Sequence, residues 1–105
     1  MREKDYFIAK ELKEKLAKAV PLVDMKVFGS RARGDHDEYS DMDVFIEVER
    51  LDGELKKKIR AIAWEVGFEH AVHIFTLIFT RQELEESPLR SSPIVTNIYE
   101  EGLNV

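Results

Sequence analysis

The sequence predicts a small α/β sandwich, in which helices cover one short sheet. Three patterns carry this prediction: apolar residues at helical spacing near the start of the chain and again in its middle, a strictly alternating segment from Asp41 onward, and a β-rich run at 71–80. The chain has 105 residues, which is the length of a single domain spanning 1–105. Its 44% hydrophobic and 35% charged residues are typical of a globular protein.

The first helix is expected over residues 5–20, because apolar side chains recur four residues apart at Ile8, Leu12 and Leu16. Pro21 cannot continue a helix and ends it.

A short strand over 22–28 follows, and Gly29–Ser30 closes it. Residues 31–34 can form one helical turn, with Ser30 as its N-cap and Gly34 as its terminator. Residues 35–40 form a polar, acidic loop.

The second strand begins at Asp41, since its apolar residues alternate with polar ones; they are Met42, Val44, Ile46 and Val48. A second long helix is expected from Leu55 to about Gly67, and a third strand over 71–80. Thr80 caps a short helix through Glu86, and Ser92–Pro93 opens a last helix that ends at Gly102.

Composition excludes several classes of protein. There is no cysteine, so disulfide frameworks, thiolate catalysis and cysteine zinc sites are ruled out. The net charge of −5 argues against a surface built to grip long nucleic acid. No apolar run is long enough for a membrane span, and the N-terminus lacks a secretory pattern, so we expect a cytoplasmic protein. A domain of this size buries only a modest core, which leaves a partner chain or a homo-oligomer open.

Asp41 and Asp43 are the first candidate site residues. They lie two apart on a predicted strand, so their carboxylates share one face at a backbone spacing of roughly 6.5–7 Å. Carboxylates at that spacing can share divalent cations with a substrate phosphate. The alternative is a pair of solvated acids at the start of a strand.

Gly29 and Ser30 are the second candidate pair. A glycine at a strand end lets the backbone approach a ligand, and a serine at a helix start directs its hydroxyl and free N–H groups toward an anion. Arg31 and Arg33 follow at once and are candidates for neutralising phosphate charge. An ordinary capped turn is the competing interpretation.

These residues carry a family resemblance. The stretch GSRARGDHDEYSDMDVFIEVE looks like the signature of minimal nucleotidyltransferase domains, in the DNA polymerase beta superfamily, of the MntA-like antitoxin type. In that pattern Gly-Ser is followed by ten residues and then Asp-x-Asp. Here Gly29–Ser30 is followed by 31–40 and then Asp41-Met42-Asp43.

The resemblance spans essentially the whole chain and implies a small mixed sheet flanked by helices, a polymerase-beta palm-like nucleotidyltransferase fold. It implies Asp41 and Asp43 as catalytic metal ligands for Mg²⁺, with Mn²⁺ as the alternative, and Gly29, Ser30, Arg31 and Arg33 as nucleotide-binding residues. The implied reaction is transfer of AMP from ATP to an acceptor hydroxyl. Domains of this kind are similar to antitoxins that adenylylate a tyrosine of a HEPN-type toxin, which makes a HEPN-family partner the expected acceptor.

One position departs from the pattern. The family commonly has a third carboxylate on the strand after the second long helix, where this chain has His73. His73 is a candidate metal ligand or base, or a structural histidine. This departure motivates an alternative function, a catalytically weak nucleotide-binding module that inhibits or scaffolds a partner. A nucleic-acid tailing enzyme is the third hypothesis.

Two further features have open interpretations. Trp64 lies beside the apolar stripe of the second long helix, as rim packing or as a partner contact. Lys56, Lys57 and Lys58 with Arg60 form a solvated helix face or a patch for RNA or an acidic partner.

Overall fold

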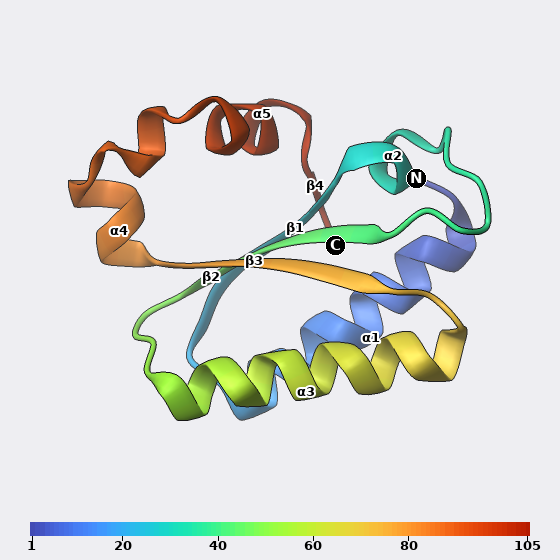
Figure 1. The fold of residues 1–105 in the computed structure, drawn as a ribbon, viewed down its shortest axis with the longest axis horizontal. Helices are drawn as coiled ribbons and strands as arrows, with labels where there is room; N and C mark the ends of the chain where they lie inside the picture. Colours follow the sequence, from blue (N-terminus) through green and yellow to red (C-terminus); the bar gives the residue numbers. More distant parts are fainter.

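The computed structural model describes residues 1–105 as one α/β unit (Figure 1). Its elements, in chain order, are α1 (Glu3–Ala19), β1 (Leu22–Phe28), α2 (Gly29–Arg33), β2 (Met42–Val48), α3 (Gly53–His70), β3 (Ile74–Thr80), α4 (Arg81–Glu86), the 3₁₀ turn η1 (Pro88–Ser91), α5 (Pro93–Glu101) and β4 (Leu103–Asn104). The expected α/β class is confirmed, and the expected elements occur in the expected order, followed by one further strand, β4.

The four strands form one mixed sheet in the order β3-β2-β1-β4. β1 pairs with β2 and with β4 in antiparallel fashion, whereas β2 and β3 are parallel. The parallel pair needs a crossover, and α3 supplies it. The small mixed sheet flanked by helices, expected from the resemblance, is therefore present.

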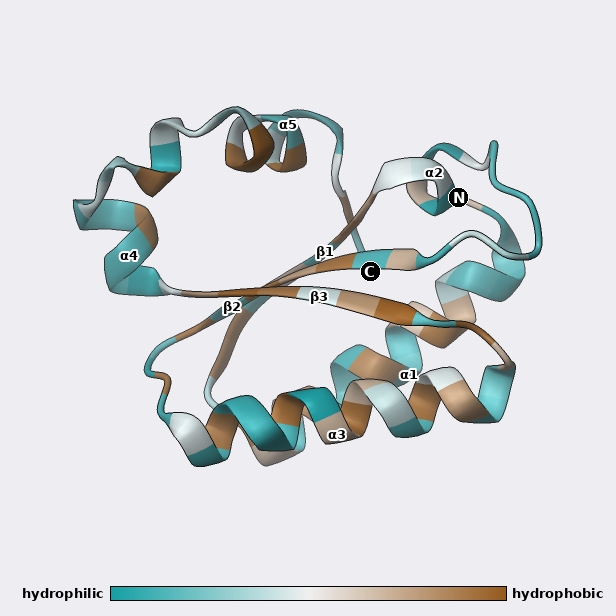
Figure 2. Cartoon of the chain, viewed as in Figure 1, coloured by the Kyte–Doolittle hydropathy of each residue, from teal (hydrophilic) through white to brown (hydrophobic).

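The two faces of the sheet are covered differently. α1 and α3 lie on one face, and α4 and α5 lie on the other (Figure 1). The face toward α1 and α3 holds a core of 17 buried residues, among them Leu12, Val44, Ile46 and Ile59. The opposite face holds a cluster of four buried residues, Phe45, Leu84, Val95 and Ile98. Figure 2 shows the corresponding brown stripes on α3 and α5 turned toward the sheet.

Side-chain caps begin three of the helices. Asp52 accepts a hydrogen bond from the Leu55 backbone N–H at 2.8 Å and starts α3. Thr80 caps α4 as predicted and forms a capping box with Glu83, and Ser92 caps α5 ahead of Pro93.

Several boundaries differ from the expectation. α3 continues past Gly67 to His70, and Ala71, with φ 55°, takes the left-handed position that ends it. Gly67 is instead a point of close approach, because a Cβ there would overlap the Val72 carbonyl oxygen. Gly102 follows α5 in an extended conformation and leads into β4, a strand that the sequence did not indicate.

Candidate functional site

The turn after β1 has the backbone that only glycine adopts easily. Gly29 has φ 74° and is the first residue of α2, and Gly34, with φ 80°, ends that helix. A Cβ on Gly29 would overlap the carboxylate of Asp43. The absence of a side chain at Gly29 therefore lets an acidic group of β2 lie directly against the turn.

Asp43 reaches the turn because of strand register. It pairs with Phe28 of β1, the residue before Gly29, and with Phe75 of β3. Burial raises the pKa of the Asp43 carboxyl, the neighbouring charge of Asp41 raises it further, and Arg33 lowers it. A nearby cation would relieve both the burial penalty and the repulsion from Asp41.

Asp41 lies just before β2 and its side chain is half-exposed. His73 lies just before β3, and its Nδ1 is 3.2 Å from Oδ2 of Asp41. The parallel register of Met42 with Ile74 brings these two residues side by side. The candidate third ligand is thus beside Asp41, with its side chain 70% exposed.

The two arginines behave differently. Arg33 is exposed, its Nε lies 3.1 Å from Asp35 Oδ2, and its charge reaches Asp43. Arg31 is buried and donates to Asp5 Oδ1 at 2.6 Å and to the Ser40 carbonyl at 2.9 Å. Nothing in these contacts supports the expected role of Arg31 in binding phosphate.

Arg31 instead holds the loop that leads to Asp41. Its partner Asp5 is buried in α1, and Nε2 of His36 lies 3.2 Å from the other oxygen of Asp5. Arg2 donates to the carbonyl oxygens of Gly34 and His36. Sequence spacing did not reveal this network, since Asp5 and Arg31 are 26 residues apart.

Ser30 is the second residue of α2 and is not its N-cap, which is Phe28. Its backbone N–H still belongs to the first helical turn, whose N–H groups have no partner within the helix.

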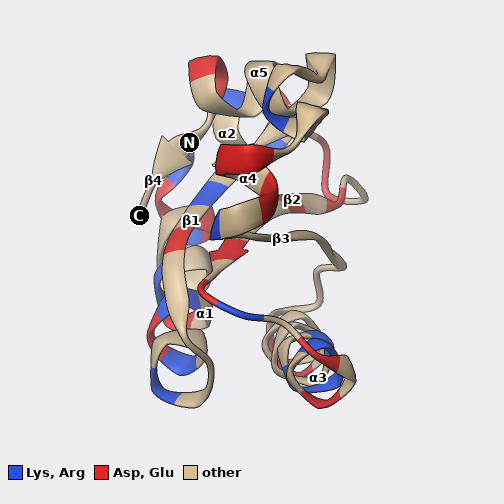
Figure 3. Cartoon of the chain, turned by 90° about the vertical axis from the view of Figure 1, so that its left-hand side faces the viewer, with Lys and Arg blue, Asp and Glu red and all other residues tan.

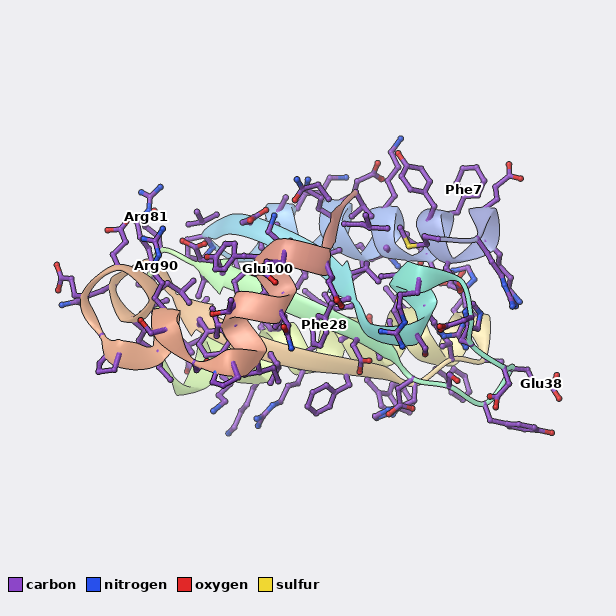
Figure 4. All side chains as sticks on the ribbon, turned by 90° about the horizontal axis from the view of Figure 1, so that it is seen from above. Phe7, Phe28, Glu38, Arg81, Arg90 and Glu100 are labelled. Atoms are coloured by element: carbon purple, nitrogen blue, oxygen red, sulfur yellow. The ribbon has the colours of Figure 1, made fainter.

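Beside this turn lies a hollow of about 220 Å³, lined by Phe28, Gly29, Arg33 and residues of α5 that include Asn97. α5 crosses above the sheet next to Phe28, whereas Glu38 lies in the far loop (Figure 4).

The donor set suits a hard divalent cation. Two carboxylates on one face, close to a turn with free N–H groups, are the ligands that Mg²⁺ takes together with phosphate oxygens. The approach of Asp43 to Gly29 is the structural feature that supports this fit. Asp43 lies against Gly29, and the charge of Asp41 reaches Asp43; a metal site formed by these residues stays a prediction.

A second cluster of side chains that can bind a metal lies away from Asp41 and Asp43. The ligand atoms of Glu11, Glu69 and His70, on α1 and α3, lie within 4.8 Å of one another, and no other trio of this kind does. Asp41, Asp43 and His73 are therefore more widely spread, so joint coordination requires rotation of their side chains.

None of the helices combines the length and apolarity needed to cross a membrane.

A family model described as nucleotidyltransferase domain matches residues 9–103. The chain belongs to this nucleotidyltransferase family. The match includes the turn at Gly29 and both aspartates, so the expected family is confirmed at this level. No curated protein sequence matches the chain significantly.

Two solved structures share the fold of this nucleotidyltransferase domain. One is a protein from Sulfolobus solfataricus, presumed to be a nucleotidyltransferase, at TM-score 0.53 and 20% identity over 92% of this chain and 75% of that one. The other is a toxin–antitoxin complex with AMP-PNP, at TM-score 0.60 and 18% identity over 90% of this chain and 70% of that one. At these identities the likeness establishes the fold.

Proposed function

We propose that this nucleotidyltransferase domain transfers AMP from ATP to a hydroxyl group of a partner protein. The observation that carries the proposal is the approach of the Asp43 carboxylate to Gly29, with Asp41 two residues away. It joins a cation-binding acid pair to a turn whose backbone can approach phosphates.

The proposed reaction is a displacement at the α-phosphorus of ATP. The acceptor oxygen forms a bond to that phosphorus, the bond to the β-phosphate oxygen breaks, pyrophosphate leaves, and the hydroxyl proton passes to solvent. Divalent metal would lower the pKa of the acceptor hydroxyl and stabilise charge on the leaving group. Asp41 and Asp43 would hold the metal, and the backbone of Gly29 and Ser30, together with Arg33, would orient the phosphates.

We assign Arg31 to positioning. Its bonds to Asp5 and to the Ser40 carbonyl hold the segment that carries Asp41. The arginine beside the phosphates in this proposal is Arg33, which is exposed next to the Gly29 turn.

The acceptor we propose is a tyrosine of a HEPN-type toxin, in an antitoxin role. Its support is the motif resemblance together with the fold shared with a toxin–antitoxin complex that contains AMP-PNP. A cytoplasmic location follows from this role.

The test is transfer of label from α-labelled ATP, with Mg²⁺ or Mn²⁺, to the product of the adjacent gene. Asp43→Asn keeps the size of the side chain and removes its charge, and we expect transfer to fall on the order of 10³-fold. Calorimetry of ATP and metal binding to the chain alone provides a readout that needs no acceptor. Failure to bind ATP with millimolar Mg²⁺ or Mn²⁺ would contradict the proposal.

His73 favours a second candidate function, a nucleotide-binding module that acts on a partner without transfer. An imidazole stands beside Asp41 where a carboxylate would complete a harder ligand set. In this version ATP binds, the partner binds, and no label moves in either the native chain or the Asp43→Asn variant.

His73 also bears on the metal. If it acts as a third ligand, its nitrogen favours Mn²⁺ over Mg²⁺, and His73→Asp shifts the preference toward Mg²⁺. His73→Gln serves as the control, because it removes the imidazole without adding a charge. Equal Mn²⁺ affinity in all three proteins would show that His73 is not a ligand.

A further inference from the structure

β3 is a long, open edge of the sheet. It pairs with β2 on one side only, while the other end of the sheet is the two-residue strand β4. In Figure 1, β3 lies in front of the other strands and no segment passes before it. Its outer backbone groups, except the N–H of Thr80, which donates to Glu83 Oε1 at 3.0 Å, are therefore available to pair with another strand.

The hydrogen-bond pattern shows which residues face outward. The Met42 N–H donates to the His73 carbonyl at 2.9 Å. In a parallel ladder every second residue bonds to a given neighbour, so Phe75, Leu77 and Phe79 direct their backbone toward β2. Ile74, Thr76, Ile78 and Thr80 direct theirs outward.

This edge lacks the usual protection against pairing. Edge strands of monomeric proteins are commonly interrupted by charges, prolines or bulges. β3, with the sequence IFTLIFT, has none of these, and Figure 3 shows it without acidic or basic residues. Phe75 is 44% exposed on it.

The strand is also close to palindromic. When two copies run antiparallel with Leu77 opposite Leu77, Phe75 lies opposite Phe79 and Thr76 lies opposite Ile78. Ile74 then lies opposite Thr80, so every pair joins like shapes: leucine with leucine, aromatic with aromatic, β-branched with β-branched. Such cross-strand pairs stabilise antiparallel sheets.

The register also satisfies the backbone. In this arrangement the outward-facing residues Thr76 and Ile78 oppose each other on both sides of the axis and exchange N–H···O=C bonds, whereas the N–H of Thr80 stays with Glu83 of the α4 capping box. Leu77 lies at the two-fold axis in a non-hydrogen-bonded pair. An interface with two-fold symmetry needs this self-complementarity.

An aromatic stripe on α3 borders the same edge. Trp64 and Phe68 are 65% and 75% exposed, and their rings stack at 5.1 Å between centroids. They line a groove of about 550 Å³ that reaches Arg60, Ile74 and Thr76. Contiguous exposed apolar patches commonly mark interaction surfaces.

Charge along α3 matches a second copy in the reverse direction. Lys56 and Arg60 precede Trp64 and Phe68 at helical spacing along one side of the helix. Two antiparallel α3 helices bring the basic half of one stripe toward the aromatic half of the other. Cations over aromatic faces are favourable contacts.

We propose that two copies of this chain form a dimer through antiparallel pairing of β3 centred on Leu77, with the two α3 stripes in contact. The sheet then continues across both copies. The site residue Asp43 lies on β2, one strand in from the paired edge, and Gly29 follows β1, the next strand along. This inference is independent of the proposed function, because its tests require neither nucleotide nor metal.

The first test is the solution mass. Sedimentation of the full chain is expected to give twice the 12.2 kDa of one copy at micromolar concentration. Thr76→Pro removes an outward N–H that no strand within the chain uses, so the fold is kept and the mass falls to that of one copy. A single-copy mass for the unaltered chain across the micromolar range would overturn the proposal, and so would a folded Thr76→Pro variant that stays dimeric.

The second test fixes the register and does not depend on Thr76→Pro folding. The chain has no cysteine, so Leu77→Cys introduces the only thiol. Across the two-fold axis the paired Cα atoms lie at a distance that permits a disulfide, and mild oxidation is expected to crosslink the dimer. Phe75→Cys is the matched control: its two copies would be roughly 13 Å apart, from a rise of ~3.3 Å per residue, and should not crosslink. Equal crosslinking of both variants, or of neither, would contradict the register.

Discussion

The two faces of the sheet serve different purposes. The face toward α1 and α3 holds the 17-residue core, to which β1 and β2 contribute more than one apolar residue each and β3 contributes Ile74. The opposite face combines a four-residue core under α4 and α5 with an open end that exposes Asp41, Asp43 and His73. Stability thus resides mainly on one face, which leaves the other free to carry closely spaced acids that repel each other.

The largest effect on stability should come from the face covered by α1 and α3. Ile59 is fully buried on α3, and Ile59→Ala should lower the free energy of unfolding by about 2–5 kcal/mol, because it removes apolar contacts and leaves a cavity. Ile94→Ala is the control on the site side: Ile94 is half-exposed, and a change below about 0.5 kcal/mol is expected. Denaturant unfolding measures both, and similar losses would contradict the division of roles.

The Arg31–Asp5 ion pair joins α2, beside the candidate site, to α1, on the face with the larger core. Arg31→Met should cost about 3 kcal/mol of stability, because it leaves Asp5 buried without its closest partner. Adding Asp5→Leu to Arg31→Met should restore part of that loss in the same unfolding measurement. If the double variant is less stable than the single one, the pair is not the source of the effect.

A smaller effect separates glycine geometry from site chemistry. Gly29→Ala and Gly34→Ala both place an L-residue at positive φ, and each should cost about 1–2 kcal/mol. Only at Gly29 does the new Cβ meet Asp43; at Gly34 nothing lies within 4 Å. Calorimetric metal titration should therefore show weaker binding, by about tenfold or more, in Gly29→Ala alone.

The smallest effect concerns pH. Burial raises the pKa of Glu47 above its ordinary 4.5, and Asp24, which lies opposite it on β1, raises it further. A carboxyl whose pKa is higher in the folded state stabilises the fold below its unfolded pKa and loses that contribution as pH rises through the folded value.

The contribution of Glu47 to the free energy of unfolding should therefore fall as the pH rises from about 4.5. Glu47→Gln should be more stable at neutral pH by about 0.2–1 kcal/mol and should lack this component of the pH dependence. Thermal unfolding at several pH values measures it. A Gln variant that is less stable than the native chain at pH 7 would show that the charge of Glu47 is favourable.

Much of the fold and the candidate site could be predicted because their signals are local. Alternation from Met42 to Val48 marked β2, and spacing of four residues marked α1. Asp41 and Asp43 share a face because successive side chains of a strand alternate. The Gly29 turn was recognisable because its backbone conformation requires a residue type that is visible in the sequence.

Tertiary structure decided what depends on distant partners. The buried position of Arg31 follows from Asp5, 26 residues earlier, and the neighbour of Asp41 is His73, 32 residues later, through the register of β2 with β3. β4 escaped prediction because a two-residue strand has no periodicity of its own and exists only by pairing with Lys26 and Val27. The open edge of β3 likewise depends on strand order, which no local pattern encodes.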